Sequence, residues 1–469
     1  MRHHSYRRQL PLVMLAVCSA VLLGWVLAAR GEGGEPRYFA VKNARIVPVS
    51  GPVIENGTVV IAKGLIQSVG TNVTIPPEAW VIDGTGMTVY PGLIDAGTNL
   101  GLEQAESGGA GDRKPGPGRN ASGPEDRPGT TPWRVAANEL KTDDKRIESW
   151  RDAGFTTALS VPEGGIFPGQ ASVIDLAGAR AGDYVVRATA TLPVSLKPVG
   201  GFFGFPNSLM GTIGYVRQVL DDTAWYTQAE PIYQANPTKS ERPPYDRTEV
   251  TLSRALQNNE IVLLPGNNSV QILRALRLAQ EWKIRAVLYG GQQGYDVTAA
   301  LAAAKIPVLV SLKWPERAKD ADPDAEQTLR QLRFRDRAPG TPAALAKAGV
   351  KFAFYSDGLA GPKDIFTSVK KATDAGLAPD AALRAMTLDA ADILGLSDRL
   401  GSIEPGKIAN LVVADGDIFN EKTKVKHVFV DGRWFEIHEV TPPEKLDDKK
   451  TAPAPSAAEQ SRAIAEVGR

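Results

Sequence analysis

The stretch DGTGMTVYPGLIDAGTNLGL, residues 83–102, determines the fold class because the pattern of apolar segments and turn residues changes across it. Before it, short apolar segments rich in β-branched residues are separated by Gly and Asn turns, which is typical of β-strands. After it, short apolar segments alternate with helical patterns, which is typical of α/β domains. The stretch therefore marks the passage from a small β-domain into a larger α/β domain.

The β-strand texture occurs at both ends of the chain. The first set of segments is NARIVPV (43–49), GTVVIA (57–62), GLIQSVG (64–70) and WVIDGTG (80–86), and the second is NLVVADG (410–416) and KHVFVDGRW (426–434). We interpret the two sets as halves of one composite β-sandwich, joined in space although distant in sequence. The alternative is two unrelated caps.

The middle of the chain alternates between strands and helices. The expected strands are GFTTALSV (154–161), EIVLLPG (260–266), IRAVLYGG (284–291), IPVLVSL (306–312) and VKFAFYSDG (350–358). Helices are expected over 269–283 and 341–349, where Ser269 and Thr341 can serve as N-caps. Continuously apolar strands between helices indicate a parallel sheet covered on both faces. A (β/α)8 TIM-like barrel fits this length, and a doubly wound sheet is the alternative.

These sequence patterns predict five segments and two loops. The segments are a signal peptide or membrane anchor (1–36), the N-terminal half of the sandwich (37–88), the barrel (89–400), the C-terminal half of the sandwich (401–440) and a disordered tail (441–469). Residues 104–133, rich in Gly and Pro, are expected to form a loop that buries no core, and residues 440–469 an exposed tail. Neither stretch carries a chemical motif.

The N-terminus predicts export. Arg2, Arg7 and Arg8 precede an uncharged apolar run from Leu10 to Ala29, as in a signal peptide or an uncleaved anchor. The lone Cys18 lies inside this run, and we interpret it as a buried thiol. We expect a protein that is periplasmic, or anchored in the membrane and facing the periplasm.

Composition restricts the chemistry. The 469 residues hold 54 Lys and Arg against 53 Asp and Glu, so no nucleic-acid partner is expected, nor any membrane contact beyond the N-terminal segment. One cysteine excludes an internal disulfide and a cysteine-based zinc site. The four histidines are His3, His4, His427 and His438, so residues 5–426 supply no imidazole. His427 is expected to be a structural side chain of a strand.

Residues 83–102 resemble the PGLIDxHxH signature of the amidohydrolase superfamily, most nearly its imidazolonepropionase-like branch. Three further segments agree: residues 57–70 resemble the family's sandwich, FYSDG (354–358) its strand-eight Asp, and residues 385–417 its return from barrel to sandwich. The resemblance covers residues 38–440. It implies the barrel, and an ancestral hydrolysis of non-peptide carbon–nitrogen bonds.

The resemblance also implies a metal site that these residues do not reproduce. Family members hold a divalent metal on two strand-one histidines and on histidines of later strands, and the strand-eight aspartate takes the proton of the metal-bound water. Here HxH is replaced by Gly97-Thr98-Asn99, and strands five and six end in Leu264–Asn267 and Tyr289–Gln292. Of the family's site, only Asp357 remains. Whether the chain is an enzyme stays open, and no metal ligand is assigned.

Three hypotheses about the function of this site remain. Mg²⁺ or Ca²⁺ could bind oxygen ligands from Asp95, Asn99, Glu103 and Asp357, whereas zinc and any other cofactor are not expected. Metal-free hydrolysis could use Asp357 as base, with Lys313 or Asn267 positioning a carbonyl. We favour the third reading, a pseudoenzyme that binds a small polar ligand or assembles with a histidine-bearing relative as a hetero-oligomer. Its polar pocket would hold Asn99, Asn267, Asn268, Gln292, Gln293 and Asp357.

Overall fold

The structure is a computed structural model that describes residues 38–103, 127–200, 204–317, 322, 324 and 326–437. The expected export segment with His3, His4 and Cys18, most of the 104–133 loop, and the tail with His438 lie outside the described residues. Among the helices that are described, none is both long enough and apolar enough to cross a bilayer.

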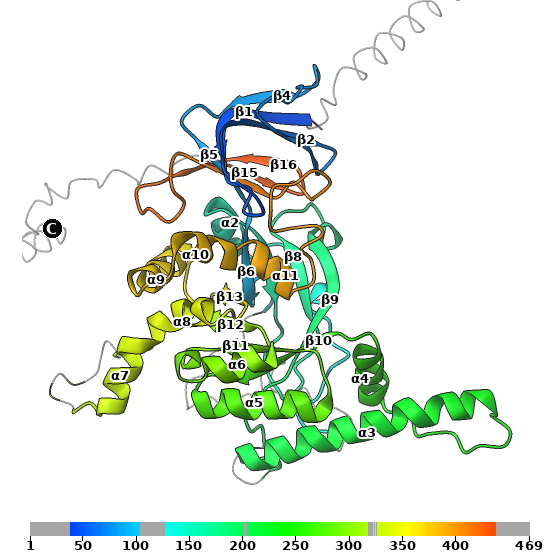
Figure 1. The fold of residues 1–469 in the computed structure, drawn as a ribbon. Helices are drawn as coiled ribbons and strands as arrows, with labels where there is room; N and C mark the ends of the chain where they lie inside the picture. The colour runs from blue at the N-terminus through cyan, green and yellow to red at the C-terminus, as the bar shows by residue number, and fades with distance from the viewer. Residues whose placement is uncertain are drawn as a thin grey trace, which may run out of the picture. The chain divides into compact units, whose positions relative to one another are not determined.

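One sheet combines strands from both ends of the chain (Figure 1). Its strands are β1 (Tyr38–Ile46), β2 (Ile54–Ala62), β3 (Leu65–Gly70), β4 (Trp80–Asp83), β5 (Thr88–Pro91), β14 (Leu411–Ala414), β15 (Val425–Val430) and β16 (Arg433–Glu436). The strand order is β16-β15-β14-β5-β1-β2-β3, and β4 pairs with β1. The two halves join where β14 runs antiparallel to β5, with Val412 opposite Tyr90. The composite β-domain predicted from the sequence is confirmed.

The two ends of this sheet fold over each other. Phe39 on β1 and Phe429 on β15 are separated by two strands in the sheet order, yet their ring centroids lie 5.4 Å apart. Trp434 on β16 lies 6.0 Å from the Phe39 ring. These contacts bury apolar rings between two layers, as in a sandwich.

The second sheet is the barrel. Its strands are β6 (Leu93–Thr98), β7 (Phe155–Ser160), β8 (Ala171–Asp175), β9 (Val185–Pro193), β10 (Ile261–Gly266), β11 (Ala286–Gly290), β12 (Val308–Ser311) and β13 (Phe352–Tyr355), paired in chain order. β13 also lies against β6, and the Ser356 N–H donates to Asp95 Oδ1 on β6 over 3.0 Å, which brings the two edges of the sheet together. The expected barrel is confirmed.

The barrel departs from eight parallel strands at β8, which runs antiparallel to both neighbours. The connection from β7 to β8 contains Gly164 and Gly165, both with positive φ, and no α-helix lies between residues 161 and 185. A short connection without a helix can only return antiparallel. β8 and β9 were not among the strands expected from the sequence.

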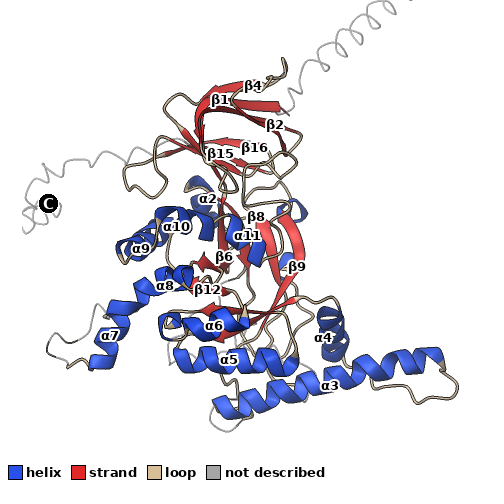
Figure 2. Ribbon diagram, in the orientation of Figure 1, coloured by secondary structure: helices blue, strands red, loops and turns tan. Residues whose placement is uncertain are grey.

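Helices surround the barrel (Figure 2). They are α2 (Lys145–Asp152), α3 (Leu209–Ala235), α4 (Arg247–Gln257), α5 (Ser269–Trp282), α6 (Thr298–Ala304), α7 (Leu329–Arg337), α8 (Thr341–Lys347), α9 (Pro362–Asp374), α10 (Pro379–Ala385) and α11 (Leu388–Ile393), with short 3-10 turns between some of them. Both predicted helices form, but their expected caps are wrong. Asn268 caps α5 by accepting from Gln271 N over 3.0 Å, while the Thr341 hydroxyl donates to Gln292 O instead of capping α8.

The long helix α3 extends beyond the body of the barrel (Figure 1). Its buried side chains all fall between Thr212 and Tyr226, so its last two turns make no core contact. α4 runs beside it, and the hydroxyls of Thr227 and Ser253 meet at 2.8 Å.

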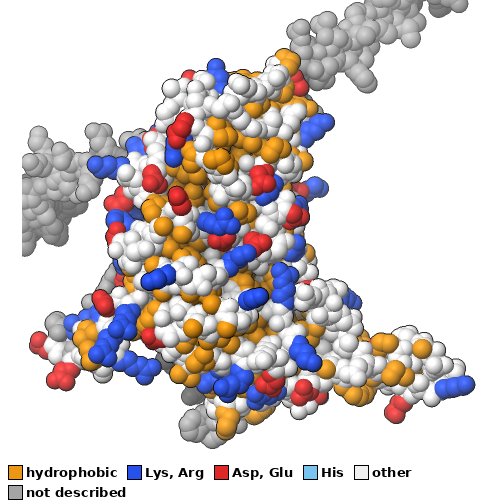
Figure 3. All heavy atoms as spheres, in the orientation of Figure 1, with side chains coloured by type: hydrophobic (Ala, Val, Ile, Leu, Met, Phe, Trp, Pro, Cys, Tyr) orange, Lys and Arg blue, Asp and Glu red, His pale blue; other side chains and the backbone are white. Residues whose placement is uncertain are grey.

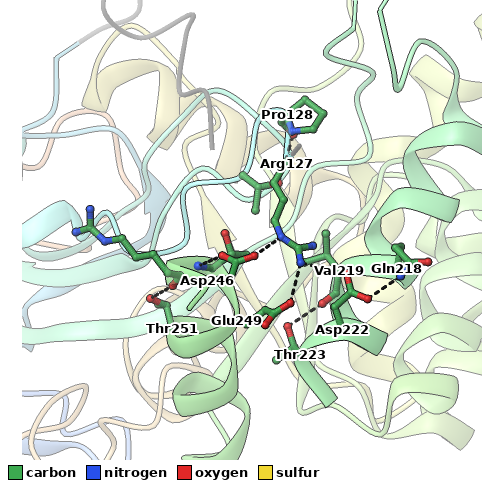
Figure 4. A network of polar contacts seen from close by, with 12 residues as sticks. Arg127, Pro128, Gln218, Val219, Asp222, Thr223, Asp246, Glu249 and Thr251 are labelled. Carbon is green, nitrogen blue, oxygen red and sulfur yellow. Dashed lines mark hydrogen bonds and ion pairs between the residues drawn. The ribbon is translucent and has the colours of Figure 1, made fainter. Parts of the chain in front are cut away.

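Several of the last residues of the Gly- and Pro-rich loop are buried, although residues 104–133 were expected to bury no core. The Arg127 guanidinium ion-pairs with Asp246 of the α4 cap over 2.5 Å, with Glu249 of α4 over 2.8 Å and with Asp222 of α3 over 3.1 Å (Figure 4). Thr130 and Thr131 are also buried. An isolated arginine in a loop carries no sequence signal for this, because its carboxylate partners are about a hundred residues away.

Candidate functional site

The candidate site lies at the carboxyl ends of the parallel strands. β6 and β7 are parallel, as are β9 to β13, so their carboxyl ends share the rim on which TIM barrels carry their active sites. Gly97 lies near the end of β6 and Asn99 directly follows it. Asn267 follows β10, Gln292 follows β11 and Asp357 follows β13.

Tyr355 fills the space next to Gly97. A Cβ added at Gly97 would stand 3.2 Å from Cδ2 and 3.3 Å from Cβ of Tyr355, which is closer than ordinary carbon–carbon contact. Tyr355 is buried. Burial and the nearby Asp357 charge raise the pKa of its hydroxyl, which keeps it neutral. A side chain at position 97 would therefore need the Tyr355 ring to move.

Asp95 is enclosed in the barrel wall. Its Oδ1 accepts from Ser356 N over 3.0 Å and from Gly97 N over 3.3 Å, and its Oδ2 accepts from Trp150 Nε1 over 3.4 Å. Burial raises the pKa of this carboxyl to about 6, despite the opposing effect of these donors. Asp95 is thus tied to its own wall and to α2.

Asp357 stands at the centre of a small polar cluster. The Ser311 hydroxyl, at the end of β12, donates to Asp357 Oδ2 over 2.7 Å. Ser311 Oγ in turn accepts from Lys313 N over 3.1 Å and from Gln292 Nε2 over 3.3 Å. Asp357 itself is exposed, with a left-handed φ of 50°. The cluster leaves one exposed carboxylate at the rim.

Gln292 and Lys313 meet through the backbone. Gln292 Nε2 also donates to Lys313 O over 2.5 Å, while the Lys313 side chain is exposed. Lys313 therefore contributes its peptide groups to the cluster.

Asn99 and Asn267 make their contacts outside the Asp357 cluster. Asn99 Oδ1 accepts from Arg146 Nη1 over 2.7 Å, and its Nδ2 donates to Glu163 Oε1 over 3.3 Å. Asn267 is exposed, and its Oδ1 occupies the space beside Gly290. The start of α5 is held by two further amides of the expected pocket, Asn268 and Gln293. That pocket of amide side chains is thus divided among separate structural contacts.

Comparisons with known proteins agree with this architecture. The model of the amidohydrolase family matches residues 246–435. An amidohydrolase from Thermotoga maritima MSB8 is 28% identical, with a TM-score of 0.72 over 85% of this chain and 100% of its own. This chain is thus similar to the amidohydrolase family in sequence over residues 246–435, and to an amidohydrolase in fold over most of its length.

More distant solved structures share the fold. A molinate hydrolase is 16% identical, with a TM-score of 0.52 over 90% of this chain and 100% of its own. A prolidase solved with N-methylphosphonate-L-proline is 19% identical, with a TM-score of 0.52 over 85% of this chain and 99% of its own. A comparison with curated proteins finds no match.

The residues at this rim do not fit the divalent metal that the resemblance implies. Residues 5–426 contain no histidine, and the Tyr355 side chain lies directly against Gly97. Within the described ranges, no three His, Cys, Asp or Glu side chains form a group that could hold a metal ion. Asp95, Glu103 and Asp357 therefore do not converge, and Glu103 pairs instead with Lys141 over 3.3 Å.

Sequence reasoning missed Ser311, Tyr355 and Tyr289 as residues of the site. The Tyr289 hydroxyl donates to Val194 O over 3.2 Å, and burial together with the Asp357 charge raises its pKa. All three lie at or next to the last residue of a barrel strand, which is the only signal that could have pointed to them. His427 lies in the β-domain, where its Nδ1 accepts from Trp434 Nε1 over 3.2 Å.

Proposed function

We propose that this chain is a non-catalytic member of the amidohydrolase superfamily that binds a small polar ligand or acts as a partner subunit. The observation that carries the proposal is the buried Tyr355 ring, which lies so close to Gly97 that even a Cβ there would crowd it. The lack of histidine in residues 5–426 supports it.

The chemistry of the site supports the same proposal. The family's hydrolysis depends on a metal that lowers the pKa of bound water and polarises the carbonyl. Here the acidic side chains near the rim are engaged separately: Asp95 by backbone and indole N–H groups, and Asp357 by the Ser311 hydroxyl. Asp357 without a Lewis acid could accept a proton but could not stabilise the oxyanion that forms.

Elemental analysis tests the proposal. We expect the purified chain to hold far less than about one equivalent of Zn, Fe, Mn, Ni or Co after dialysis without chelator. About one equivalent of tightly held metal, lost on Asp357→Ala and kept on Asp380→Ala, would overturn it. Asp380 is an exposed carboxylate at the start of α10, so it serves as the matched control.

The alternative is a surviving hydrolase centred on Asp357, through an oxygen-ligand metal or without metal. Its support is that Asp357 remains exposed at the rim and holds a hydrogen bond from Ser311. Hydrolysis of amide or cyclic amide substrates that is lost with Asp357→Asn, but kept with Asp380→Asn, would establish this alternative in place of the non-catalytic role.

The expected partner is a histidine-bearing relative, and α3 provides a surface on which to test this. Met210, Trp225 and Ile232 are exposed by 84%, 54% and 63%, and apolar side chains follow the extending arm in Figure 3. Trp225 and Ile232 are two turns apart and share one face. Exposed apolar surface of this kind favours a protein contact.

Co-purification from native membrane extracts distinguishes a subunit from a lone chain. We expect a histidine-bearing relative to co-purify with the tagged chain, and Trp225→Asp with Ile232→Asp to release it. Gln234→Asp should not, because nine residues from Trp225 place Gln234 on the opposite side of α3. Recovery of a lone monomer would contradict the subunit role and leave ligand binding as the function.

We also propose that the protein is exported, on the basis of the basic and apolar N-terminal sequence. Intact cells whose outer membrane has been permeabilised should expose the chain to added protease. Protection that ends only on cell lysis would place the protein in the cytoplasm instead.

A further inference from the structure

A cavity of about 600 Å³ opens at the amino ends of three neighbouring barrel strands. It is lined by residues just before β11, β12 and β13, together with the end of α6 and Asp392 and Ile393 of α11. Because the three strands are parallel, this rim is opposite to the one that carries Asp357. Lys351 in the cavity precedes β13 and Asp357 follows it, so the whole strand lies between them. The cavity is therefore separate from the candidate site.

Positive charge gathers around this cavity without matching negative charge. Arg285 and Lys305 line it and are exposed, and neither side chain makes a hydrogen bond or an ion pair with any described residue. The third cation, Lys351, is paired with Asp392, and this contact lowers the pKa of that carboxyl. Among the described residues that line the cavity, Asp392 is the only acid. The cavity therefore carries a net positive charge.

A second arginine adds to this excess of positive charge. Arg187 is held in place because Nη1 donates to Leu394 O over 3.0 Å and Nη2 to Gly395 O over 2.9 Å. Arg187 Nη1 and Arg285 Nη2 lie 3.3 Å and 3.8 Å from the point where a Cβ on Gly395 would stand. Like charges this close repel one another, and an anion between or beside them relieves the repulsion.

The rest of the lining is apolar. It consists of Ile284, Leu301, Ile306, Pro307, Val350 and Ile393, with small contributions from neighbouring alanines, a valine and a glycine. A cavity of this size that combines apolar walls with a few charged groups is typical of small-molecule sites. The arginine fork suits a planar carboxylate or a phosphate oxyanion.

We propose that this cavity binds a small organic anion, with its oxyanion group on Arg285 and Lys305 and its apolar body against Ile284, Ile306 and Ile393. The proposal does not depend on whether the opposite rim of the barrel is catalytic. It assigns a ligand site to the face of the barrel away from the family's active site.

Binding of 1-anilinonaphthalene-8-sulfonate, a sulfonate with an apolar body, tests the proposal by fluorescence titration and calorimetry. We expect saturable binding at one site, competed by benzoate and by inorganic phosphate. Arg285→Gln with Lys305→Gln should weaken binding at least about tenfold, because two charge-assisted contacts are lost. Both side chains are exposed, so the double variant should keep its circular dichroism spectrum and Tm.

Two further variants distinguish binding in this cavity from a general attraction of the anion to positive surface charge. Lys347→Gln removes an exposed cation at the end of α8 that does not line the cavity, and it should leave binding unchanged. Ala302→Phe places a ring in the cavity and should abolish binding while the positive charges remain. Equal affinity in the double variant and the unaltered chain, or equal loss with Lys347→Gln, would overturn the proposal.

Discussion

Single side chains determine how much space the carboxyl rim of the barrel offers and how the barrel is attached to the β-domain. Tyr355 stands beside Gly97 at the carboxyl rim, and its buried, neutral hydroxyl lies close to Asp357. At the join with the β-domain, Asp175 Oδ1 accepts from the Thr157 hydroxyl and from Asn410 Nδ2, each over 2.8 Å. The first position controls the space at the rim, and the second ties the barrel to its sandwich.

Gly97→Ala should lower the free energy of unfolding by about 1 to 3 kcal/mol, because the new methyl group meets the Tyr355 ring. In a Tyr355→Ala background the same change should lower the free energy of unfolding much less. A double-mutant cycle in urea measures this difference. Gly214→Ala is the control: its new Cβ meets nothing within 4 Å, and α3 should gain stability. Additive costs at Gly97 and Tyr355 would show that Tyr355 does not fill this space.

Asp175→Asn should stabilise the protein at high pH. Burial raises the pKa of Asp175 to about 7, so the folded state favours the protonated carboxyl. That preference stabilises the fold fully below the ordinary pKa near 3.8 and is lost as pH rises through about 7. An asparagine at this position can accept both observed hydrogen bonds through Oδ1 without the charge.

At pH 8 the Asp175→Asn variant should therefore be roughly 2 to 4 kcal/mol more stable than the unaltered protein, and at pH 4 about equal to it. Urea denaturation at both pH values measures this. Asp392→Asn should behave oppositely, since Lys351 lowers the pKa of Asp392. A constant difference between the Asp175→Asn variant and the unaltered protein at both pH values would contradict the raised pKa.

Among the elements, β8 and the α3–α4 pair show how tertiary contacts adapt the barrel. β8 runs antiparallel because the short connection from β7 holds Gly164 and Gly165 in left-handed conformations and forms no helix. α3 and α4 are joined to the end of the 104–133 loop by Arg127 and its three carboxylates (Figure 4). The direction of β8 thus follows from its local connection, whereas Arg127 acquires its role only through contacts with residues distant in the sequence.

Arg127→Met should destabilise the protein by about 2 to 3 kcal/mol at neutral pH, because it leaves three partly buried carboxylates near one another. Arg217→Met breaks the exposed pair with Glu281 and should cost less than about 1 kcal/mol. Thermal unfolding of the two variants compares them directly. Equal losses would show that burial adds nothing at Arg127.

The molecule as a whole is held together where the chain returns from barrel to sandwich. Asn410 O accepts from Gly92 N over 2.8 Å, its Nδ2 donates to Asp175, and its Oδ1 accepts from Asp431 N over 2.7 Å. The three contacts join the start of β6, the barrel strand β8 and the hairpin after β15. The sandwich is therefore a structural part of the barrel, although its halves lie at opposite ends of the sequence.

A chain ending at Ile437 should unfold cooperatively with the Tm of the full chain, since it keeps every described strand and its partners. A chain ending at Ala409 should fail to fold, because β5 loses its partner β14 and Phe39 loses the Phe429 ring. Circular dichroism and calorimetry distinguish these outcomes. A folded, soluble chain ending at Ala409 would contradict the structural role of the return.

The barrel, the composite sandwich and the absence of histidine between residues 5 and 426 could all be predicted from the amino-acid order. Such features can be read because hydrophobic period and turn residues act locally, and because a missing residue type is missing in any fold. The folded chain alone shows that Tyr355 fills the space at Gly97, that Ser311 donates to Asp357 and that Asn99 turns to Arg146. Those outcomes depend on which side chains meet across strands far apart in sequence, and no local pattern encodes them.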